Sequence, residues 1–275
     1  MLIVNADDWG RDRLTTDRIL DCVTAGAVSA VSAMVFAEDS ERAAALALDR
    51  SIDVGLHLNF TSPFTAAAVP PALADDQRRI ARYLRLHRYA QSLFNPALIA
   101  CFEHVAAAQI NEFRRLYGVD PVRIDGHHHM HLCANVLRQR LLPPGTIVRR
   151  NFSFQPGEKG MVNRAYRRFV DHRLARRHRL VDFLFSLAPI QPAPRLHRIV
   201  SLARHRVVEL ETHPAQRDEF GFLTTGQLFE STGDLRLARH TDALSETPGT
   251  AGVRPRSPHV PALVSSGSDS RGADA

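Results

Sequence analysis

The chain begins with MLIVNADDWG (residues 1–10), in which an apolar run interrupted by Asn5 leads directly into two adjacent carboxylates, Asp7 and Asp8. Neighbouring side chains of a strand point to opposite faces, so both carboxylates can reach one site only where the strand ends and the chain turns. Gly10 permits such a turn. Two close carboxylates repel each other, which is tolerated mainly where a cation or a proton transfer requires them. The alternative is that one of them caps the following helix.

Short apolar runs alternate with helical patterns along much of the chain. Strands are predicted over residues 2–8, 31–36, 52–60, 122–131, 146–150 and 206–214, and helices over 14–26 and 38–50. A strand-then-helix order indicates a parallel sheet, in either a barrel or an open doubly wound form. We predict an α/β fold, namely a (β/α) barrel-like single domain with mostly parallel strands and some missing or irregular units.

Two segments depart from this alternation. Residues from about 62 to 118 carry helical patterns after a Pro-rich start and no strand pattern, which favours a helical insertion beside the end of the third strand. Residues 246–275 are rich in Pro, Gly and Ser and poor in aromatic residues, a composition typical of a disordered tail. We therefore expect one domain over residues 1–245, for which the chain is long enough.

The chain is basic, with a formal net charge of +6 and a pI near 9.9. Lys159 is the one lysine, so the other 34 of the 35 basic residues are arginines, a bias typical of a GC-rich coding sequence rather than of a phosphate-binding surface. The densest basic stretch, residues 164–180, is interpreted as a solvated helix face. A nucleic-acid or anionic-membrane patch is the alternative. We predict no nucleic-acid partner.

Cysteine usage and the N-terminus bear on the compartment. Cys22, Cys101 and Cys133 are odd in number and far apart, which indicates neither a disulfide framework nor a cysteine zinc site and favours a reducing environment. Polar residues interrupt any secretory pattern at the N-terminus, and no apolar run reaches the roughly 18 residues that span a bilayer. We expect a cytoplasmic protein without stable membrane insertion; a homo-oligomer is compatible with the sequence, which does not indicate the oligomeric state.

The segment DGHHHMH (residues 125–131) holds four imidazoles in five positions. If the segment is extended, His127, His129 and His131 share one face; if it is helical, His127 and His131 align one turn apart. Either geometry could present imidazoles to a metal ion. The alternative is a set of histidines hydrogen-bonded in a polar core.

His57 and His213 lie late in their predicted strands, as Asp7 and Asp8 do. The carboxyl ends of parallel strands form the face on which sites are built, so these four residues and His127 can converge. One carboxylate and two imidazoles suit Zn²⁺ or another divalent transition ion and leave positions open for water. One aspartate would then hold the ion and the other would take a proton from water, which makes hydrolysis the favoured hypothesis.

The motifs NADDWG, GLHLNF, DGHHHMH and ELETHP, in this order and at these spacings, resemble the YdjC-like carbohydrate deacetylases. That family includes chitooligosaccharide deacetylase and members associated with hopanoid biosynthesis, and the resemblance covers roughly residues 1 to 240. It implies a (β/α) barrel-like fold and an enzyme that removes acetyl groups from N-acetylated amino sugars with one divalent metal ion, whether zinc, magnesium or another.

The resemblance also implies roles for individual residues. Asp7 would be the general base and His213 the acid for the leaving amine, while the metal ligands would be Asp8, His57 and His127. Water activated by the metal would attack the N-acetyl carbonyl of an oligosaccharide, a glycolipid or a glycosylated metabolite.

Further residues are matched to the family more loosely. Arg149 resembles an arginine that orients the base, and His129 and His131 are expected to hold ring orientations or to touch substrate. Trp9 replaces the usual Phe and would keep an aromatic wall. Arg11 and the aspartate after it replace a Leu-Ser pair, which leaves substrate preference open.

Two other functions stay open from the sequence. A metal-dependent hydrolase of another bond, such as a phosphoester, would favour a second metal or a cationic clamp on phosphate. A basic binding protein with a structural metal site would need a fourth protein ligand, for which Cys133 is the nearest cysteine.

Overall fold

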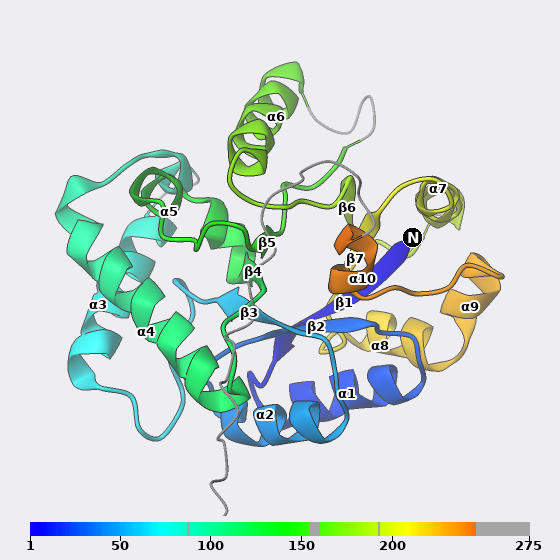
Figure 1. Cartoon of the computed structure of the whole chain (residues 1–275), viewed down its shortest axis with the longest axis horizontal. Coiled ribbons are helices and arrows are strands. Elements are labelled where there is room, and N and C mark those ends of the chain that lie inside the picture. The colour runs from blue at the N-terminus through cyan, green and yellow to red at the C-terminus, as the bar shows by residue number, and fades with distance from the viewer. Residues whose placement is uncertain (87–88, 155–159, 192, 246–275) are drawn as a thin grey trace, which may run out of the picture.

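The computed structural model describes residues 1–86, 89–154, 160–191 and 193–245 (Figure 1). Its strands form one sheet in the order β5-β4-β3-β2-β1-β7-β6, in which every neighbouring pair is parallel. The strands are β1 (Leu2–Trp9), β2 (Ala30–Ala33), β3 (Val54–Leu58), β4 (Arg123–Gly126), β5 (Ile147–Val148), β6 (Phe183–Ser186) and β7 (Val208–Thr212).

The sheet curls until its two edges approach each other. The backbone N–H of Val148 in β5 donates to the carbonyl of Arg179 at 2.9 Å, and the N–H of Ser153 donates to the carbonyl of Leu184 in β6 at 2.8 Å. The architecture is thus a half-barrel of parallel strands, which confirms the predicted (β/α) barrel-like fold.

Helices cover the outside of the half-barrel (Figure 1). The α-helices of the described residues are α1 (Arg13–Thr24), α2 (Ser40–Asp49), α3 (Pro71–Arg85), α4 (Ile99–Tyr117), α5 (Ala134–Gln139), α6 (Met161–Ala175), α7 (Ala193–Ala203), α8 (Arg217–Thr224), α9 (Gln227–Thr232) and α10 (His240–Ser245). Three 3-10 helices, η1 (Ala90–Ser92), η2 (Pro96–Leu98) and η3 (His127–Leu132), lie in the connections. No helix of the described parts is both long and apolar enough to cross a membrane.

The outer face of the sheet carries the main hydrophobic core. Because side chains alternate along a strand, every second residue of the central strands points outward and packs against helices. These outward residues are apolar and buried, among them Leu2, Val4 and Ala6 of β1, Leu56 and Leu58 of β3, Ile124 of β4 and Leu210 of β7.

The inner face has a different composition. One end of the half-barrel is filled by a small apolar cluster formed by Ile3, Ala30, Ile147, Val181, Ala243 and Leu244. Above this cluster the inward positions are polar and joined by hydrogen bonds or ion pairs: Asn5, Asp7, Ser32, His57, Arg123, Asp125, Arg149, Glu209 and Glu211. The alternation of the strands therefore places a charged layer inside the fold, toward the carboxyl ends of the strands.

Some expectations from the sequence differ from the structure. The strand predicted over residues 122–131 ends at Gly126, because the histidines that follow form η3 rather than an extended or α-helical segment. The sequence pattern does not predict strand β6. Residues 62–118 contain α3, η1, η2 and α4, and their interpretation as an insertion stays a prediction. The tail predicted over residues 246–275 lies outside the described residues.

Candidate active site

The two adjacent aspartates of β1 reach the same site because the backbone changes direction between them. Asp7 follows the alternation of the strand and points inward, whereas Asp8 has a φ of +70°. The register between β1 and β2 shifts between Ala6 and Trp9, so Asp8 occupies an irregularity that turns its side chain toward the same site. The predicted turn is present, but it lies within the last residues of β1 rather than after the strand.

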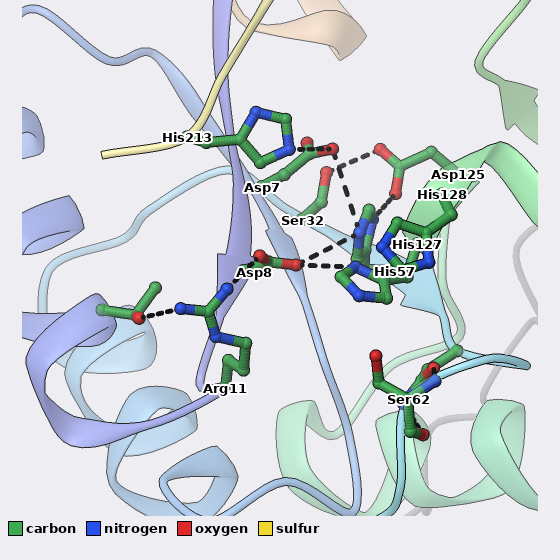
Figure 2. Close-up of polar contacts among 12 residues, drawn as sticks. Asp7, Asp8, Arg11, Ser32, His57, Ser62, Asp125, His127, His128 and His213 are labelled. Atoms are coloured by element: carbon green, nitrogen blue, oxygen red, sulfur yellow. Dashed lines mark hydrogen bonds and ion pairs between the residues drawn. The ribbon is translucent and has the colours of Figure 1, made fainter. Parts of the chain in front are cut away.

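Asp8, His57 and His127 form the candidate metal site (Figure 2). One possible ligand atom from each residue lies within 4.8 Å of the other two. Oδ1 of Asp8 lies 3.0 Å from Nδ1 of His127 and 3.5 Å from Nε2 of His57, yet this buried oxygen accepts no hydrogen bond of normal geometry. A buried oxygen between two imidazole nitrogens fits a divalent cation, and the donor set suits zinc and similar ions.

The ring of His57 is held in one orientation by Asp125. The two residues are partners across β3 and β4, and Nδ1 of His57 donates to Oδ1 of Asp125 at 2.7 Å. Nε2 consequently faces the two aspartates of β1, which is the tautomer that a metal-binding imidazole needs. Oδ2 of Asp125 accepts hydrogen bonds from Ser32 at 2.6 Å and from Arg123 at 3.0 Å, which fixes the carboxylate in turn.

Asp7 is clamped by Arg149. Nη1 and Nη2 of Arg149 each donate to one oxygen of Asp7 at 2.7 Å, a bidentate pair that fixes the plane of the carboxylate. The same guanidinium donates to Glu209 at 2.7 Å and to Glu211 at 3.1 Å. Oδ2 of Asp7 lies 3.9 Å from Nε2 of His57, so the clamped carboxylate stands next to the candidate metal ligands.

The interior carries more negative than positive charge. Four inward-facing carboxylates share it with two guanidinium groups: Asp7, Asp125, Glu209 and Glu211 against Arg123 and Arg149. Burial lowers the pKa of His57, but the neighbouring carboxylates outweigh burial and raise this pKa to about 9. A divalent cation bound here would displace that proton and offset the same negative charge.

The carboxylate of Asp8 is stable in its ionised form. Burial opposes ionisation, but the contacts with His127, His57 and Arg11 outweigh burial and lower the pKa of Asp8 below its usual range. Nη1 of Arg11 donates to Oδ2 of Asp8 at 2.7 Å, on the opposite side of the carboxylate from the imidazoles (Figure 2). Arg11 therefore orients the candidate ligand and adds a positive charge next to it.

His213 stands beside Asp7 at a more open position. It follows β7, and its Nε2 lies 4.0 Å from Oδ2 of Asp7 and 3.9 Å from Oε1 of Glu211 (Figure 2). Its backbone N–H donates to the buried carboxylate of Glu219 at 2.7 Å, which holds the start of this loop. The side chain of His213 is 29% exposed, against 4% for Asp7, so it can meet a substrate entering from solvent.

The histidine segment distributes its four imidazoles in different directions. His128 and His129 have left-handed backbones with φ of +54° and +57°, so successive rings do not share one face. The rings contact Asp8 (His127, 3.0 Å), Thr61 (His128, 2.9 Å), Glu211 (His129, 3.2 Å) and the backbone carbonyl of Arg149 (His131, 2.9 Å). One of the four imidazoles belongs to the candidate ligand set, and the other three support the loop and its surroundings.

Gly126 explains why this loop can fold back so tightly. A β-carbon at Gly126 would lie 2.9 Å from the backbone nitrogen of His131 and 3.0 Å from its side chain. His131 is wholly buried, and burial lowers its pKa to about 3, so its neutral ring donates from Nε2 to the carbonyl of Arg149. His131 is therefore placed to hold the loop, and its burial excludes contact with a substrate.

The expectation for Trp9 is wrong. Its side chain is fully buried, and its Nε1 donates to the carbonyl of Ala43 in α2 at 3.2 Å. Trp9 lies in the core beneath the site, because the irregularity at Asp8 directs the next side chain toward the helices, and it forms no wall for a substrate.

Three residues that support the site are not among the candidates from the sequence. Asp125, Glu209 and Glu211 form the ion pairs with His57 and Arg149. A signal was present, because charged residues occupy alternate positions in the strands RIDG and VELET, where the residues between them are apolar.

Cysteine takes no part in the candidate site. Cys133 is buried at the end of η3, and burial raises its pKa to about 12. Among the described residues, the groups that could hold a metal ion contain aspartate, glutamate and histidine only.

The fold and the site together define a (β/α) half-barrel protein with a candidate divalent-metal site at the carboxyl ends of its strands. A family model described as YdjC-like protein matches residues 1–244, and the chain therefore belongs to the YdjC-like protein family. This match confirms the resemblance that the four sequence motifs indicate.

Curated relatives and a solved structure agree with this assignment. Chitooligosaccharide deacetylases of Yersinia pestis (strain Pestoides F) and Yersinia pseudotuberculosis (serotype O:1b) are each 32% identical over 139 residues, covering 50% of this chain. The match spans 52% of each relative, about half its length. A structure from Enterococcus faecalis described as a cellobiose-phosphate cleavage protein has a TM-score of 0.60 and 17% identity, covering 88% of this chain and 97% of that chain, which supports the fold alone.

Proposed function

We propose that the chain is a metal-dependent hydrolase that removes the N-acetyl group from an N-acetylated amino sugar. Membership of the YdjC-like family and the names of the Yersinia relatives support a carbohydrate deacetylase. The observation that carries the metal requirement is the buried Oδ1 of Asp8, which lacks a hydrogen bond between the imidazoles of His57 and His127. The proposal includes an oligosaccharide, a glycolipid or a glycosylated metabolite as the substrate.

Asp8, His57 and His127 would hold one divalent ion. Such an ion lowers the pKa of water and polarises a carbonyl oxygen. The chain contributes the orientation of the ligands: Asp125 fixes the ring of His57, and Arg11 fixes the carboxylate of Asp8. Zinc, magnesium and related ions remain candidates.

Asp7 would act as the general base. Arg149 fixes its carboxylate, and Oδ2 lies on the side of His57, so a water molecule beside the ligand set is within reach of Asp7. Asp7 would take a proton from this water as its oxygen attacks the acetyl carbonyl.

His213 would act as the acid. Its Nε2 lies 4.0 Å from Oδ2 of Asp7 and its side chain is partly exposed, so it would donate a proton to the amide nitrogen as the carbon–nitrogen bond breaks. The products are acetate and the free amino sugar. The proton that Asp7 takes from water can return to solvent when the acetate leaves.

The geometry favours this reaction over the two alternatives. A phosphoester hydrolase needs cationic groups for phosphate, but Arg11 and Arg149, which lie next to the two aspartates, are both paired with carboxylates. A structural metal site is closed by four protein ligands, whereas the candidate set in the described residues has three and lacks cysteine.

Acetate release measured together with metal content tests the proposal. The purified chain would be assayed on N-acetylated chitooligosaccharides, N-acetylglucosaminyl glycolipids and simple N-acetylglucosaminides, before and after chelation and after addition of Zn²⁺, Co²⁺ or Mg²⁺. We expect chelation to abolish acetate release and one of the ions to restore it. Full activity in metal-free protein would overturn the metal requirement, and cleavage of phosphate esters without any acetate release would overturn the substrate class.

A further inference from the structure

Helix α6 exposes an apolar face. The side chains of Met161 and Val162 are each 85% exposed, Phe169 is 59% exposed and Tyr166 is 45% exposed. The spacing 161, 165, 169 and 162, 166 places these residues and Ala165 on one side of the helix. Clusters of large exposed apolar side chains are unusual on a surface that meets only water.

The opposite side anchors the helix to the body. Val170 and Leu174 are buried, and Asp171 accepts hydrogen bonds from Arg150 and from the side chain of Asn151. The exposed face is therefore presented by a helix that is held in place. In Figure 1, α6 projects at the edge of the molecule that lies farthest from α1 and α2.

The charge around this face is positive. The exposed arginines of the helix are Arg168 and Arg173, while Arg164 and Arg167 are half-buried and Arg167 lies over the ring of Phe154. The one acidic residue of the helix, Asp171, is buried and paired with Arg150. Arginines next to an exposed row of Met, Val, Tyr and Phe are the pattern of a helix that lies in the interface of a bilayer, where the apolar face enters the acyl boundary and the cations meet lipid phosphates.

The apolar face is continuous with the pocket beside the candidate active site. A pocket of about 850 Å³ is lined by Val162 and Tyr166 of α6 and, on its other side, by His128 and His129. His129 in turn contacts Glu211, which shares Arg149 with the proposed base. A surface seated on α6 would therefore lie at the entrance to the site.

We propose that α6 docks this side of the molecule on an anionic lipid surface, with Met161, Val162 and Phe169 in the interfacial layer. The exposed arginines Arg168 and Arg173 contact the lipid phosphates. The pocket beside His129 then opens toward the membrane. The proposed membrane-docking surface is additional to the proposed reaction and does not depend on it.

A second copy of the chain fits this face less well. A pairing of two α6 helices through this face would bring Arg168 and Arg173 of each copy together, and the helix has no exposed acidic residue to compensate them. An anionic bilayer supplies both the apolar layer and the negative charge that the face lacks.

Vesicle co-sedimentation of the full chain tests the proposal. We expect the protein to pellet with vesicles of phosphatidylcholine containing about 30% phosphatidylglycerol and to pellet far less with phosphatidylcholine alone. Raising the salt from about 0.05 to about 0.5 M should weaken the binding, because it screens the arginine–phosphate attraction.

A matched pair of double variants separates the apolar face from net charge. Met161→Asp with Phe169→Asp should reduce binding to the anionic vesicles by about tenfold or more. The control, Leu14→Asp with Leu48→Asp, makes the same charge change at side chains that are 63% and 58% exposed on α1 and α2, at the far edge of the molecule, and should bind much as the wild type does. All of the substituted side chains are exposed, so circular dichroism should show matching thermal midpoints.

Three results would overturn the proposal. One is the absence of any pelleting with anionic vesicles. Another is an equal loss of binding in both double variants, which would mean general adsorption of a basic protein. The third is a dimer in sedimentation velocity that Met161→Asp with Phe169→Asp abolishes, which would mean that a second copy covers the face.

Discussion

The inner and outer faces of the same sheet are built by opposite rules. On the outer face, Leu56, Ile124 and Leu210 pack against helices in a continuous apolar core. On the inner face, the neighbouring residues in sequence are His57, Asp125 and the two glutamates that flank Leu210, namely Glu209 and Glu211. They are also buried, but they are charged or polar. One residue along a strand separates a position that stabilises the fold from a position that carries chemistry.

The difference between the faces concerns free energy. Burying apolar side chains stabilises the folded state by roughly 25 cal/mol per Å². Burying ion pairs contributes much less, because the desolvation of each charge offsets most of the attraction, and replacing such pairs by apolar residues is often neutral or stabilising. The charged interior is thus poorly explained by stability, and the proposed cation site would account for part of it.

The largest effect should come from the two adjacent aspartates. Asp8→Ala should lose both metal and activity, because only two imidazoles remain in the ligand set. Asp7→Asn should keep the metal and lose about 10² to 10⁴ in turnover, the usual range for general-base catalysis. Metal content by mass spectrometry and rates of acetate release, measured on the same samples, decide the matter.

The reverse pattern would show that these two roles are misassigned. If Asp7→Asn loses the metal completely while Asp8→Ala keeps both metal and turnover, Asp7 is the ligand and Asp8 is not. His213→Ala should resemble Asp7→Asn, with metal retained and turnover reduced.

Shortening a side chain on the outer face should change the free energy of unfolding and leave the metal site unchanged. Leu56→Ala leaves a cavity in the main core and should lower the free energy of unfolding by about 2–5 kcal/mol. Its neighbour His57 stays in place, so the folded fraction should bind metal with unchanged affinity. Urea unfolding and metal titration of the same variant test both halves of this expectation, and a large loss of metal affinity in folded protein would show that the two faces are not independent.

An isosteric change on the inner face should act on the metal site as well. Asp125→Asn weakens the acceptor that holds Nδ1 of His57, and we expect the metal affinity of the folded protein to fall by about 10- to 100-fold. The variant also loses the buried charge that pairs with Arg123, so its free energy of unfolding should fall too. Competition with a chromophoric chelator measures the affinity. An unchanged affinity would mean that His57 does not need this partner to bind the ion.

The smallest effect should be found at Arg11, at the rim of the site. The guanidinium lies 2.7 Å from Oδ2 of Asp8 and opposes a cation on the other oxygen, so Arg11→Leu should raise metal affinity by about two- to tenfold, limited by solvent screening of this partly exposed group. The same chelator competition applies. A fall in affinity would mean that orientation of Asp8 matters more than the charge beside it.

Local patterns predict much of this molecule, because they depend on neighbours in sequence. Alternation and the pair Asp7–Asp8 predict β1 and its polar end, and the apolar spacing predicts α1 and α2. Strand β6 is hard to predict because the run FLFS has only four residues and lacks the ionisable residues that mark the ends of β1 and β7.

Local patterns do not predict the support of the site, since it depends on closure of the barrel, and only the family resemblance indicates that Arg149 orients Asp7. Arg149 in the segment after β5 meets Asp7 of β1 and Glu209 of β7, and these strands are distant in sequence and not adjacent to β5 in the sheet. Likewise, the directions of His128 and His129 follow from left-handed backbones that the tight packing at Gly126 imposes, which a count of histidines does not reveal.

The hydrogen bond from His57 to Asp125 also supplies a spectroscopic probe. The Nδ1 proton is buried and held by a carboxylate at 2.7 Å, so it is shielded from solvent and should give a slowly exchanging, strongly downfield resonance in the proton NMR spectrum. Occupancy of Nε2 by a cation in place of a proton would shift that resonance. This resonance therefore reports whether Nε2 of His57 carries a proton or a cation, and the measurement needs no sugar substrate.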